Sequence, residues 1–434
     1  MRSRSLTSVL LLLASSAVTV LGDKPVSYDG YKVFCIKTHG HTSAIREQLE
    51  PLSLDEWSHE IDHVDVAVSP EQLAAFEALS LETHVMHDNL GSSIATESSS
   101  TTKWKRQADD PSWFDSYHDY EDHIQYFTDI QATYPNNTEA ISSGYSYQNR
   151  SIYGLHLWGA DGPGKPAVLY HGTVHAREWI AAPVVEYITL QLLQGYEIGD
   201  EDIQKLLNKY DFYVFPFVNP DGFVYTQTTN RLWRKNRQPA PPPPANQSCF
   251  GRDINRNWEF AWDANPNGAS TNPCSEIYKG LAPSDTPENA GLDKFVRQLR
   301  DSVGIKLFID WHSYGQYILS PYGYRNDLYA PELGKWEQAS SLVSEAIRDS
   351  SERRTTFTFG PSGATLYTTT GAAPDHVYSI GGADFSYTIE LPDTGDYGFI
   401  LPPEKIRPTV EELWAGQQVL LSILDADFSD DSVK

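Results

Sequence analysis

The chain has 434 residues, of which 40% are hydrophobic, and this is enough to bury the core of one large domain or of two ordinary ones. Its 58 acidic residues against 33 basic ones give a formal net charge of -25, which argues against nucleic acid and against an anionic membrane as partners. Past the N-terminal segment, no apolar run is long enough to span a bilayer, so we expect a soluble globular protein.

Residues 1–22 have the pattern of a cleaved secretory signal peptide. Arg2 and Arg4 precede the apolar run SVLLLLASSAVTVL, and the small residue Gly22 closes the segment. The run is too short to cross a bilayer comfortably, as is typical of a signal that is removed. We therefore expect a secreted, extracellular protein, in which disulfides can form.

The chain has three cysteines, so it can form at most one internal disulfide. Cys249 and Cys274 bracket a loop-rich stretch with many Pro and Asn residues and are the predicted pair, which leaves Cys35 over. Secretion also permits N-glycosylation, and sequons are present at Asn136, Asn149 and Asn246.

Residues 23 to about 90 form a compositional unit that predicts a small independent domain. The runs YKVFCIKT, LDEWSHEI and HVDVAVS predict strands, and AIREQLEPL predicts a helix between the first two. A second helix is expected to begin at Pro70, with Ser69 as its N-cap, and to end near Leu79, before a last strand in THVMH. The resulting order, β-α-β-β-α-β, is that of a ferredoxin-like α+β domain.

The stretch from residue 90 to 112, LGSSIATESSSTTKWKRQADDPS, has the composition of a flexible linker. It contains the dibasic pair Lys105 and Arg106, and exposed linkers are where proteases cut. An inert interdomain linker is the alternative. Cleavage after Arg106 would make the protein a proenzyme with three parts: a signal peptide over 1–22, an activation segment over 23–106 and a catalytic domain over 107–434.

The second domain alternates predicted strands and helices. The strands are SIYGLHLW, AVLYHG, FYVFPFVNP, IKLFIDWHS and FSYTIELP, and the helices lie near residues 180–195, 286–302, 332–350 and 404–424. Buried strands separated by amphipathic helices predict an α/β fold, with a mixed, mainly parallel central sheet and helices on both of its faces.

A candidate metal site begins where the strand AVLYHG leads into HAREWI, because His175 and Glu178 then lie at a strand-to-helix corner. Open α/β sheets place their chemistry at such corners, and the i, i+3 spacing can turn an imidazole and a carboxylate toward one point. His312 ends another predicted strand in the same topological place. Two histidines and one glutamate suit a Zn2+ ion and leave a fourth position open, as catalytic zinc requires.

A second His-x-x-Glu pair, His118 and Glu121, shows how little this short pattern means alone. It lies in a Tyr- and Asp-rich polar stretch and follows no apolar strand. The expected role is a solvated helix face, and we assign it no metal.

Further side chains suit a hydrolytic zinc site. Glu390 ends the strand FSYTIEL and can serve as a base for water or as a salt-bridge partner. Arg231 and Arg234 lie in TTNRLWRKNR, and Asn255 and Arg256 lie in GRDINRNW. Arginine forks grip carboxylates, so several of them beside a metal suggest an anionic substrate group, although each alone could form a surface ion pair.

Five motifs resemble, in the same order, those of the pancreatic-type zinc carboxypeptidases of the A/B subfamily. They are HAREW, NPDGFVYTQTTNRLWRKNR, INRNW, HSYGQYILSPYGY and ELPDTGDYGFILP. The resemblance covers about residues 112 to 425. It implies that the first domain is the family's activation propeptide, an intramolecular inhibitor that an activating protease removes. The substrates implied are the C-termini of peptides and proteins.

The resemblance also implies roles for single residues. Zinc would be held by His175, Glu178 and His312, and Glu390 would be the catalytic glutamate. Arg234 matches the arginine that stabilises the oxyanion, and Asn255 with Arg256 matches the pair that binds the terminal carboxylate. Arg177 and Arg231 match residues that assist substrate binding, and Tyr367, with Tyr378 as the weaker alternative, matches the mobile tyrosine over the bound C-terminus.

The preferred C-terminal residue depends on the floor of the substrate pocket. The alignment of TTTGAAPDHVY with the family puts Pro374 at the floor, and Gly323 and Leu366 nearby are uncharged. We therefore expect release of aromatic or aliphatic residues. A shift of one residue would put Asp375 there and predict a preference for Lys or Arg instead.

Three other functions stay open. The chain could be an inactive relative or a zinc-stabilised binding module, although Glu390 and the carboxylate-binding pair argue for an enzyme. It could also be an amidase or esterase for small acyl substrates. We expect a monomer that acts on peptide C-termini.

Overall fold

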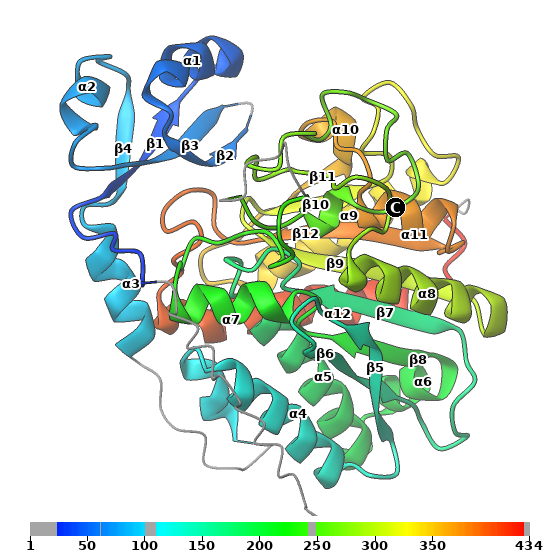
Figure 1. The fold of residues 1–434 in the computed structure, drawn as a ribbon. Helices are drawn as coiled ribbons and strands as arrows, with labels where there is room; N and C mark the ends of the chain where they lie inside the picture. The colour runs from blue at the N-terminus through cyan, green and yellow to red at the C-terminus, as the bar shows by residue number, and fades with distance from the viewer. Residues whose placement is uncertain (1–23, 61, 100–109, 242–248, 429–434) are drawn as a thin grey trace, which may run out of the picture.

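The computed structural model describes residues 24–60, 62–99, 110–241 and 249–428 (Figure 1). The predicted signal peptide, the cleavage site at Arg106 and the sequon at Asn246 lie outside these ranges, whereas Asn136 and Asn149 are exposed. Within the described ranges, no helix has both the length and the apolar character needed to cross a bilayer.

The small domain has the predicted β-α-β-β-α-β order. Its elements are β1 (Lys32–Lys37), α1 (Thr42–Leu49), β2 (Asp55–His59), β3 (His63–Val68), α2 (Leu73–Glu77) and β4 (Thr83–His87). The strands pair antiparallel in the order β2-β3-β1-β4. Phe34, Val66 and Phe76 belong to a core on the helical face, while Val33 and Ala67 pack with residues of the large domain on the other. Because side chains alternate along a strand, the second face of this sheet is turned toward the large domain.

Two boundaries in the small domain differ from expectation. Helix α2 begins after Gln72 rather than at Pro70, because residues 70–72 form a turn in which the Ser69 amide donates to the Gln72 side chain. The stretch predicted as linker begins with a helix, α3 (Leu90–Ser99), in which Leu90 and Ile94 pack against the large domain. Burial of these apolar side chains overrides the weak helix propensity of the Ser/Thr-rich sequence.

The large domain is built on an eight-stranded sheet. Its strands are β5 (Thr138–Tyr145), β6 (Ser151–Leu157), β7 (Ala167–Gly172), β8 (Asp211–Phe215), β9 (Ile305–Ser313), β10 (Tyr317–Ser320), β11 (Thr358–Pro361) and β12 (Phe385–Leu391). They are arranged in the order β11-β10-β12-β9-β7-β8-β6-β5. The central strands β12, β9, β7 and β8 are parallel, and the mixed, mainly parallel sheet confirms the predicted fold class.

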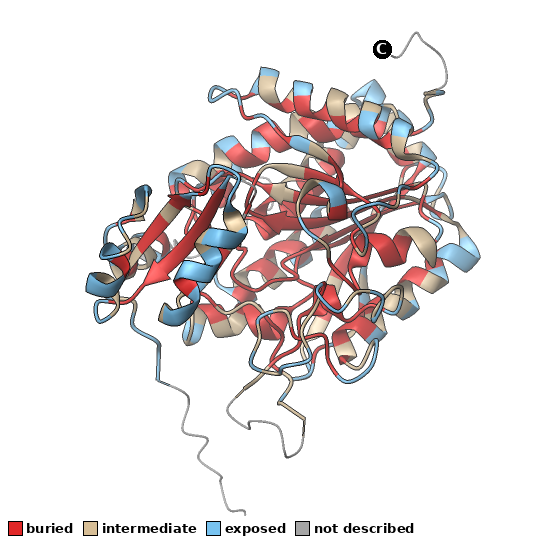
Figure 2. Cartoon of the chain, turned by 90° about the horizontal axis from the view of Figure 1, so that it is seen from above, coloured by how far each residue is buried: buried red, intermediate tan, exposed pale blue. Residues whose placement is uncertain are grey.

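Helices cover both faces of this sheet, as expected (Figure 1). They are α4 (Tyr120–Thr133), α5 (Ala181–Ile198), α6 (Glu201–Lys209), α7 (Pro220–Thr228), α8 (Pro287–Ser302), α9 (Leu333–Ser350), α10 (Ser362–Thr365), α11 (Ala373–Ser379) and α12 (Ile406–Ser422). Helices α4, α5, α9 and α12 share one core with the sheet, and α8 and α11 share the other. Figure 2 shows the strands buried and the outer faces of the helices exposed. The five predicted strands, β6, β7, β8, β9 and β12, are largely buried. Strands β5, β10 and β11 were not predicted, because β5 is mostly polar and partly exposed and the other two have only four residues each.

The second His-x-x-Glu pair, His118 and Glu121, differs from expectation in one respect. His118 is buried rather than solvated: its ring stacks on Trp113 with the centroids 3.6 Å apart, and its Nε2 lies 2.8 Å from the Trp113 carbonyl oxygen. Glu121 is exposed in the first turn of α4. The pair belongs to no cluster of potential metal ligands among the described residues.

Candidate functional site

His175, Glu178 and His312 converge at the carboxyl edge of the central strands. His175 and Glu178 lie in the turns between β7 and α5, and His312 lies near the end of β9, which pairs parallel with β7. His175 Nδ1 is 2.7 Å from Glu178 Oε1, and His312 Nδ1 is 2.9 Å from Glu178 Oε2. The two Nδ1 atoms are 3.1 Å apart. Three ligand atoms thus face one point in a buried place.

The outer nitrogens of both imidazoles face carboxylates. His175 Nε2 is 3.1 Å from Asp253 Oδ1, and His312 Nε2 is 2.9 Å from Asp310 Oδ2. Metal-ligating histidines almost always direct their second nitrogen to such a partner, which leaves the lone pair of the first nitrogen for the metal. The donor set and its surroundings therefore fit zinc. Sequence reasoning missed both aspartates, although Asp253 lies inside the INRNW region and Asp310 two residues before His312.

Electrostatics keep Glu178 in the anionic form that a metal ligand needs. Burial alone would raise the pKa of its carboxyl, but His175 and His312 hold that pKa well below its usual range. For His312, burial lowers the pKa, and Asp310 and Glu178 together raise it above the usual value. The cluster is thus built to concentrate negative charge beside two imidazoles.

Glu390 lies next to this cluster because β12 pairs parallel with β9 and places Glu390 in register with His312. Burial raises the pKa of its carboxyl to about 8; Glu178 adds to that effect, and His312 and Arg234 oppose it. A carboxyl that titrates near neutral pH can both accept and return a proton.

Asp253 links Arg234 to the metal ligands. Arg234 donates from Nη2 to Asp253 Oδ2 at 2.9 Å, while the other oxygen of the same carboxylate faces His175. Burial lowers the pKa of Arg234, but Asp253 and Glu178 raise it on balance, so this guanidinium stays charged. Its Nη1 is 3.9 Å from Glu178 Oε1, so the positive charge stands beside the metal ligands.

Asn255 and Arg256 lie in the short 3-10 helix Ile254–Arg256, which Asp253 caps through the Asn255 amide. The side-chain oxygen of Asn255 accepts from the Ala373 amide at 2.8 Å. Arg256 is buried and donates from Nη1 to the Asn255 carbonyl, but its Nε has no hydrogen-bonding partner among the described residues. A buried donor without a partner beside a cavity is suited to an anionic ligand.

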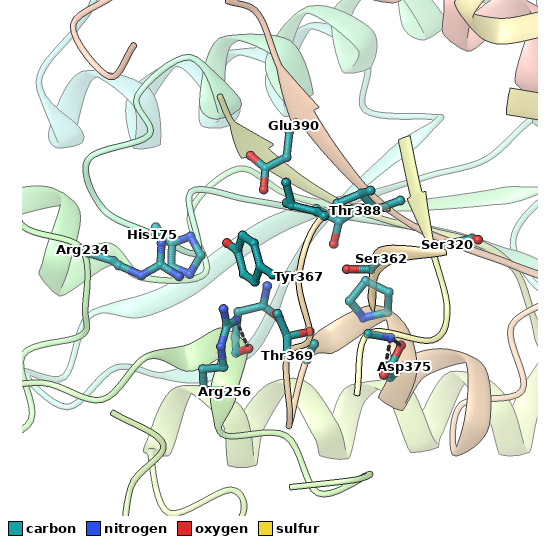
Figure 3. Close-up of a pocket in the computed structure, with 16 residues that line it drawn as sticks. His175, Arg234, Arg256, Ser320, Ser362, Tyr367, Thr369, Asp375, Thr388 and Glu390 are labelled. Atoms are coloured by element: carbon teal, nitrogen blue, oxygen red, sulfur yellow. Dashed lines mark hydrogen bonds between the residues drawn. The ribbon is translucent and has the colours of Figure 1, made fainter. Parts of the chain in front are cut away.

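A single pocket joins these groups (Figure 3). Its lining includes His175, Arg234, Asn255, Arg256 and Glu390 on one side, and Leu319, Gly323, Leu366, Tyr367, Pro374 and Asp375 on the other. Tyr378 lies elsewhere: its hydroxyl donates to Glu332 Oε2 at 2.5 Å, and its ring packs on Trp336. The structure therefore brings together every residue predicted for catalysis and metal binding, with Tyr367 rather than Tyr378 at the pocket.

Pro374 and Asp375 both border the pocket, but Asp375 is already engaged. Its two carboxylate oxygens accept from the Gly323 amide, each at 2.9 Å, and one of them accepts from the Tyr324 amide at 3.2 Å. Burial raises the pKa of Asp375 to about 7. Its immediate role is thus to hold the segment that carries Gly323.

Arg177 and Arg231 lie outside this pocket: Arg177 lines the cleft between the two domains, and Arg231 is buried and donates to the Arg177 carbonyl. The Arg177 guanidinium lies 4.1 Å over the Phe399 ring, and that of Arg231 lies 3.8 Å over the Trp179 ring. Arg231 also forms a two-pronged ion pair with Glu97 of α3, Nε to Oε2 at 2.6 Å and Nη2 to Oε1 at 2.8 Å. Both partners of this pair are buried.

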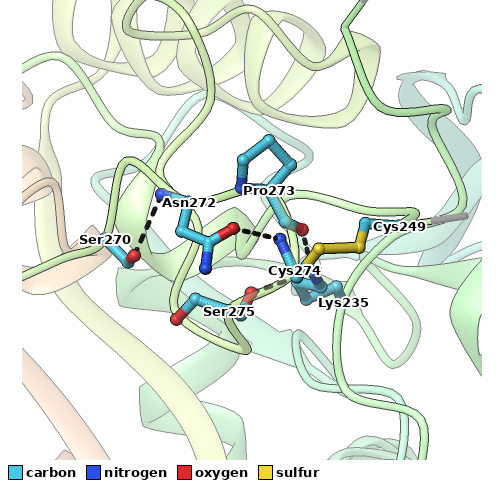
Figure 4. The surroundings of a disulfide bond; sticks show 7 residues. All are labelled: Lys235, Cys249, Ser270, Asn272, Pro273, Cys274 and Ser275. Carbon is cyan, nitrogen blue, oxygen red and sulfur yellow. Dashed lines mark hydrogen bonds between the residues drawn. A yellow bond between two sulfur atoms is a disulfide. The ribbon is translucent and has the colours of Figure 1, made fainter. Parts of the chain in front are cut away.

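The Cys249–Cys274 disulfide confirms the predicted pairing and encloses the segment that carries Asp253, Asn255 and Arg256 (Figure 4). Lys235, next to Arg234, donates to the carbonyls of Pro273 and Ser275, at 2.9 and 2.8 Å. Closing a loop of 25 residues restricts the unfolded chain by about 3–4 kcal/mol in the entropic description. The disulfide thus supports the arginine-bearing side of the pocket.

Comparisons with known proteins agree with this geometry. The profile of the family described as zinc carboxypeptidase matches residues 123–416. A metallocarboxypeptidase A-like protein of Trichophyton verrucosum is 40% identical over 433 residues, which cover 96% of this chain and 99% of that protein. The structure of thrombin activatable fibrinolysis inhibitor superposes with a TM-score of 0.82 at 27% identity, covering 91% of this chain and 99% of its own. Carboxypeptidase A of Helicoverpa armigera superposes with a TM-score of 0.78 at 26% identity, covering 93% and 99% of the two chains.

Proposed function

Since this chain belongs to the zinc carboxypeptidase family, and is thereby a zinc hydrolase that removes C-terminal residues from peptides, we propose that it is a secreted proenzyme whose processed form releases apolar residues. The observation that carries the proposal is the pocket in which His175, Glu390, Arg234 and Arg256 meet, with the other two zinc ligands, Glu178 and His312, clustered around His175. Secretion is supported by the Cys249–Cys274 disulfide and by the signal-like residues 1–22.

His175, Glu178 and His312 would hold zinc, which would supply a Lewis acid for the scissile carbonyl and for water. Glu390 takes the proton of the attacking water and delivers it to the leaving amine. Arg234, fixed by Asp253, holds positive charge where the oxyanion develops. These roles need no movement of the strands, because β7, β9 and β12 already bring the groups together.

Arg256 and Asn255 make the enzyme an exopeptidase in this proposal. The unpaired Nε of Arg256 is available to the terminal carboxylate of a substrate, and an internal peptide bond has no such carboxylate. Tyr367, on the same pocket, closes over the bound C-terminus. Arg177, in the cleft beyond the pocket, contacts substrate residues farther from the scissile bond, and Arg231 supports it through a hydrogen bond to the Arg177 carbonyl.

Replacement of Arg256 should weaken the binding of the terminal carboxylate. We expect Arg256→Met to lower kcat/KM about 10²-fold, mainly through KM, since charge-assisted hydrogen bonds are lost. Steady-state kinetics on a blocked dipeptide measure this. Arg300→Met, at an exposed arginine of α8 paired with Asp301, is the matched control and should change neither constant. A variant with unchanged KM would contradict the assigned role.

The pocket floor favours apolar residues in this proposal. Pro374 offers no charge, and the Asp375 carboxylate is occupied by two backbone amides rather than free for a lysine ammonium or an arginine guanidinium. The test is release of the C-terminal residue from blocked dipeptides ending in Phe and in Lys, by protein cut after Arg106, with and without a zinc chelator. We expect chelator-sensitive release of Phe. Release of Lys alone would make Asp375 the specificity residue, and release of neither would overturn the activity on peptides.

Latency is supported by the position of the small domain over the cleft. The ion pair between Glu97 and Arg231 occupies an arginine assigned to substrate binding, and Trp57 packs with Phe399 at the same cleft. The cleavage site at Arg106 follows Glu97 in the chain, so processing releases both Glu97 and the domain. The small domain thus acts as an intramolecular inhibitor in this proposal.

Loss of the Glu97 charge should loosen that inhibition. Removing one partner of a buried ion pair costs about 3–5 kcal/mol, and about 1.4 kcal/mol already shifts a docking equilibrium tenfold. We therefore expect Glu97→Gln to raise the activity of an uncleaved proenzyme, carrying Arg106→Gln, at least about tenfold. Glu71→Gln, at an exposed position of the same domain, is the matched control. After processing of forms with intact Arg106, Glu97→Gln and wild type should be identical, because Glu97 has been removed.

A further inference from the structure

A second cluster of ligand-type side chains lies on the small domain, at its face toward the large one. Cys35 on β1 and Asp65 on β3 are paired in register, and His63 is two residues along the same strand. Strand alternation directs all three to the face opposite the helices. One ligand atom from each lies within 4.8 Å of the others.

The distances from His63 to the two carboxylates of this cluster are longer than hydrogen bonds. His63 Nε2 is 3.8 Å from Asp65 Oδ2 and 3.8 Å from Glu60 Oε1. Atoms held about 2.1 Å from a tetrahedral ion lie about 3.4 Å apart. His63 is 7% exposed and Asp65 is fully buried, yet His63 Nε2 and Asp65 Oδ1 have no hydrogen-bonding partner among the described residues.

The contact made by His63 Nδ1 indicates which nitrogen of the ring carries the proton. Nδ1 lies 2.8 Å from Asp62 Oδ1, so it carries a proton and donates to that carboxylate. In the neutral ring, Nε2 then directs a lone pair at two carboxylates, which are themselves acceptors. This arrangement needs a second proton on His63, a proton on one of the two carboxyls, or a cation between the groups. A carboxylate behind the imidazole is also the arrangement that supports a metal-ligating histidine.

The large domain completes and closes the cluster. Tyr314 donates to Asp65 Oδ2, and Tyr317 donates to Glu60 Oε2, each at 2.5 Å. The backbone packs closely as well: a Cβ on Gly315 would lie 2.9 Å from Glu60 Oε1, and one on Gly395 would lie 3.6 Å from Cys35 Sγ. Glu60 therefore has one oxygen bound to Tyr317 and the other facing His63, whereas the Asp65 oxygen bound to Tyr314 is also the one nearest His63.

Burial and neighbouring acidic groups disfavour ionisation of the acidic side chains in this cluster. Burial, followed by the neighbouring Asp65, raises the pKa of the Cys35 thiol, and burial raises the pKa of Glu60 to about 7. Burial also raises the pKa of Asp65, with Asp393 of the large domain adding to the effect.

We propose that Cys35, His63 and Asp65, with Glu60 as the fourth ligand, form a zinc site of the proenzyme on the face of the small domain that Tyr314 and Tyr317 of the large domain contact. A thiolate and an imidazole select zinc over Ca2+ or Mg2+, which prefer oxygen ligands. This site is separate from the His175, Glu178 and His312 cluster and leaves with the small domain when the chain is processed.

The experiment uses the full proenzyme carrying Arg106→Gln, so that it stays uncleaved. Zinc is counted by mass spectrometry of the metal after gel filtration. Two zinc ions per chain are expected for this proenzyme, and one for its Cys35→Ser form and for the processed enzyme. His84→Gln, at an exposed histidine of the neighbouring strand β4, is the matched control and should retain both.

Cobalt substitution tests the ligands directly. A thiolate bound to Co2+ gives a near-ultraviolet charge-transfer band, which the nitrogen and oxygen ligands of the His175 site do not produce. The band should appear in the cobalt-loaded proenzyme and in His84→Gln, and disappear in Cys35→Ser and His63→Gln. One zinc per wild-type proenzyme without this band would overturn the proposal and leave His63 as an imidazolium between carboxylates. Because the band is measured on wild type, it decides the matter even where a variant fails to fold.

Discussion

Glu390→Gln should reduce kcat/KM on a blocked dipeptide by about 10²–10⁴-fold, the range of a lost general acid–base group. The amide keeps the size of the side chain but cannot take a proton from water or return it to the leaving amine. Glu390 is in register with His312, which places its carboxyl beside the zinc ligands. Among the described residues that line the pocket, the only other acid is Asp375, which is bound by backbone amides. Steady-state kinetics of the processed enzyme measure the loss.

Zinc content separates this effect from damage to the site. Glu390 is not a ligand, so Glu390→Gln should still contain one zinc per processed chain and keep its KM within a few-fold. Glu404→Gln, at an exposed glutamate before α12, is the matched control and should retain full activity. Activity of Glu390→Gln close to wild type would assign the proton transfer to another group.

His175→Ala should abolish zinc binding and, with it, activity. The Lewis acid contributes several kcal/mol of transition-state stabilisation, so the rate should fall by at least about a thousandfold. Loss of the imidazole also leaves Glu178 and Asp253 buried with one partner fewer, so the melting temperature should fall. Metal analysis, kinetics and calorimetry of the same preparation measure the three effects.

The second His-x-x-Glu pair, His118 and Glu121, provides the matched control for His175→Ala. His118→Ala removes a buried imidazole that stacks on Trp113 and precedes a glutamate at the same spacing. It should lower the melting temperature through lost packing while leaving zinc content and kcat/KM unchanged. Asp253→Asn should weaken metal affinity about 10–100-fold, an effect between those of the two other variants, because Asp253 orients the ligand His175 without being a ligand itself. Equal zinc content in His175→Ala and His118→Ala would refute the ligand assignment.

The two histidines of the metal site show which features of the protein a local sequence pattern can predict. The strand 167–172, which precedes His175, and the strand 305–313, which contains His312, were predictable because buried parallel strands are rich in apolar residues. The edge at which they end follows from parallel pairing, so His175, Glu178 and His312 could be placed together before any coordinates. Helix α3 was missed because its apolar residues are few and are stabilised by the large domain rather than by their own sequence.

What the sequence by itself determined is therefore the fold class, the disulfide and the residue types of the zinc site, since each depends on short-range periodicity, on cysteine count or on motifs in fixed order. Only the tertiary structure decided that Asp253 joins His175 to Arg234, that Glu97 occupies Arg231, and that His63 faces Asp65 beside Tyr314. These contacts join residues far apart in the chain, and they depend on strand register and domain docking. Both are set by the burial of whole faces, which no local pattern encodes.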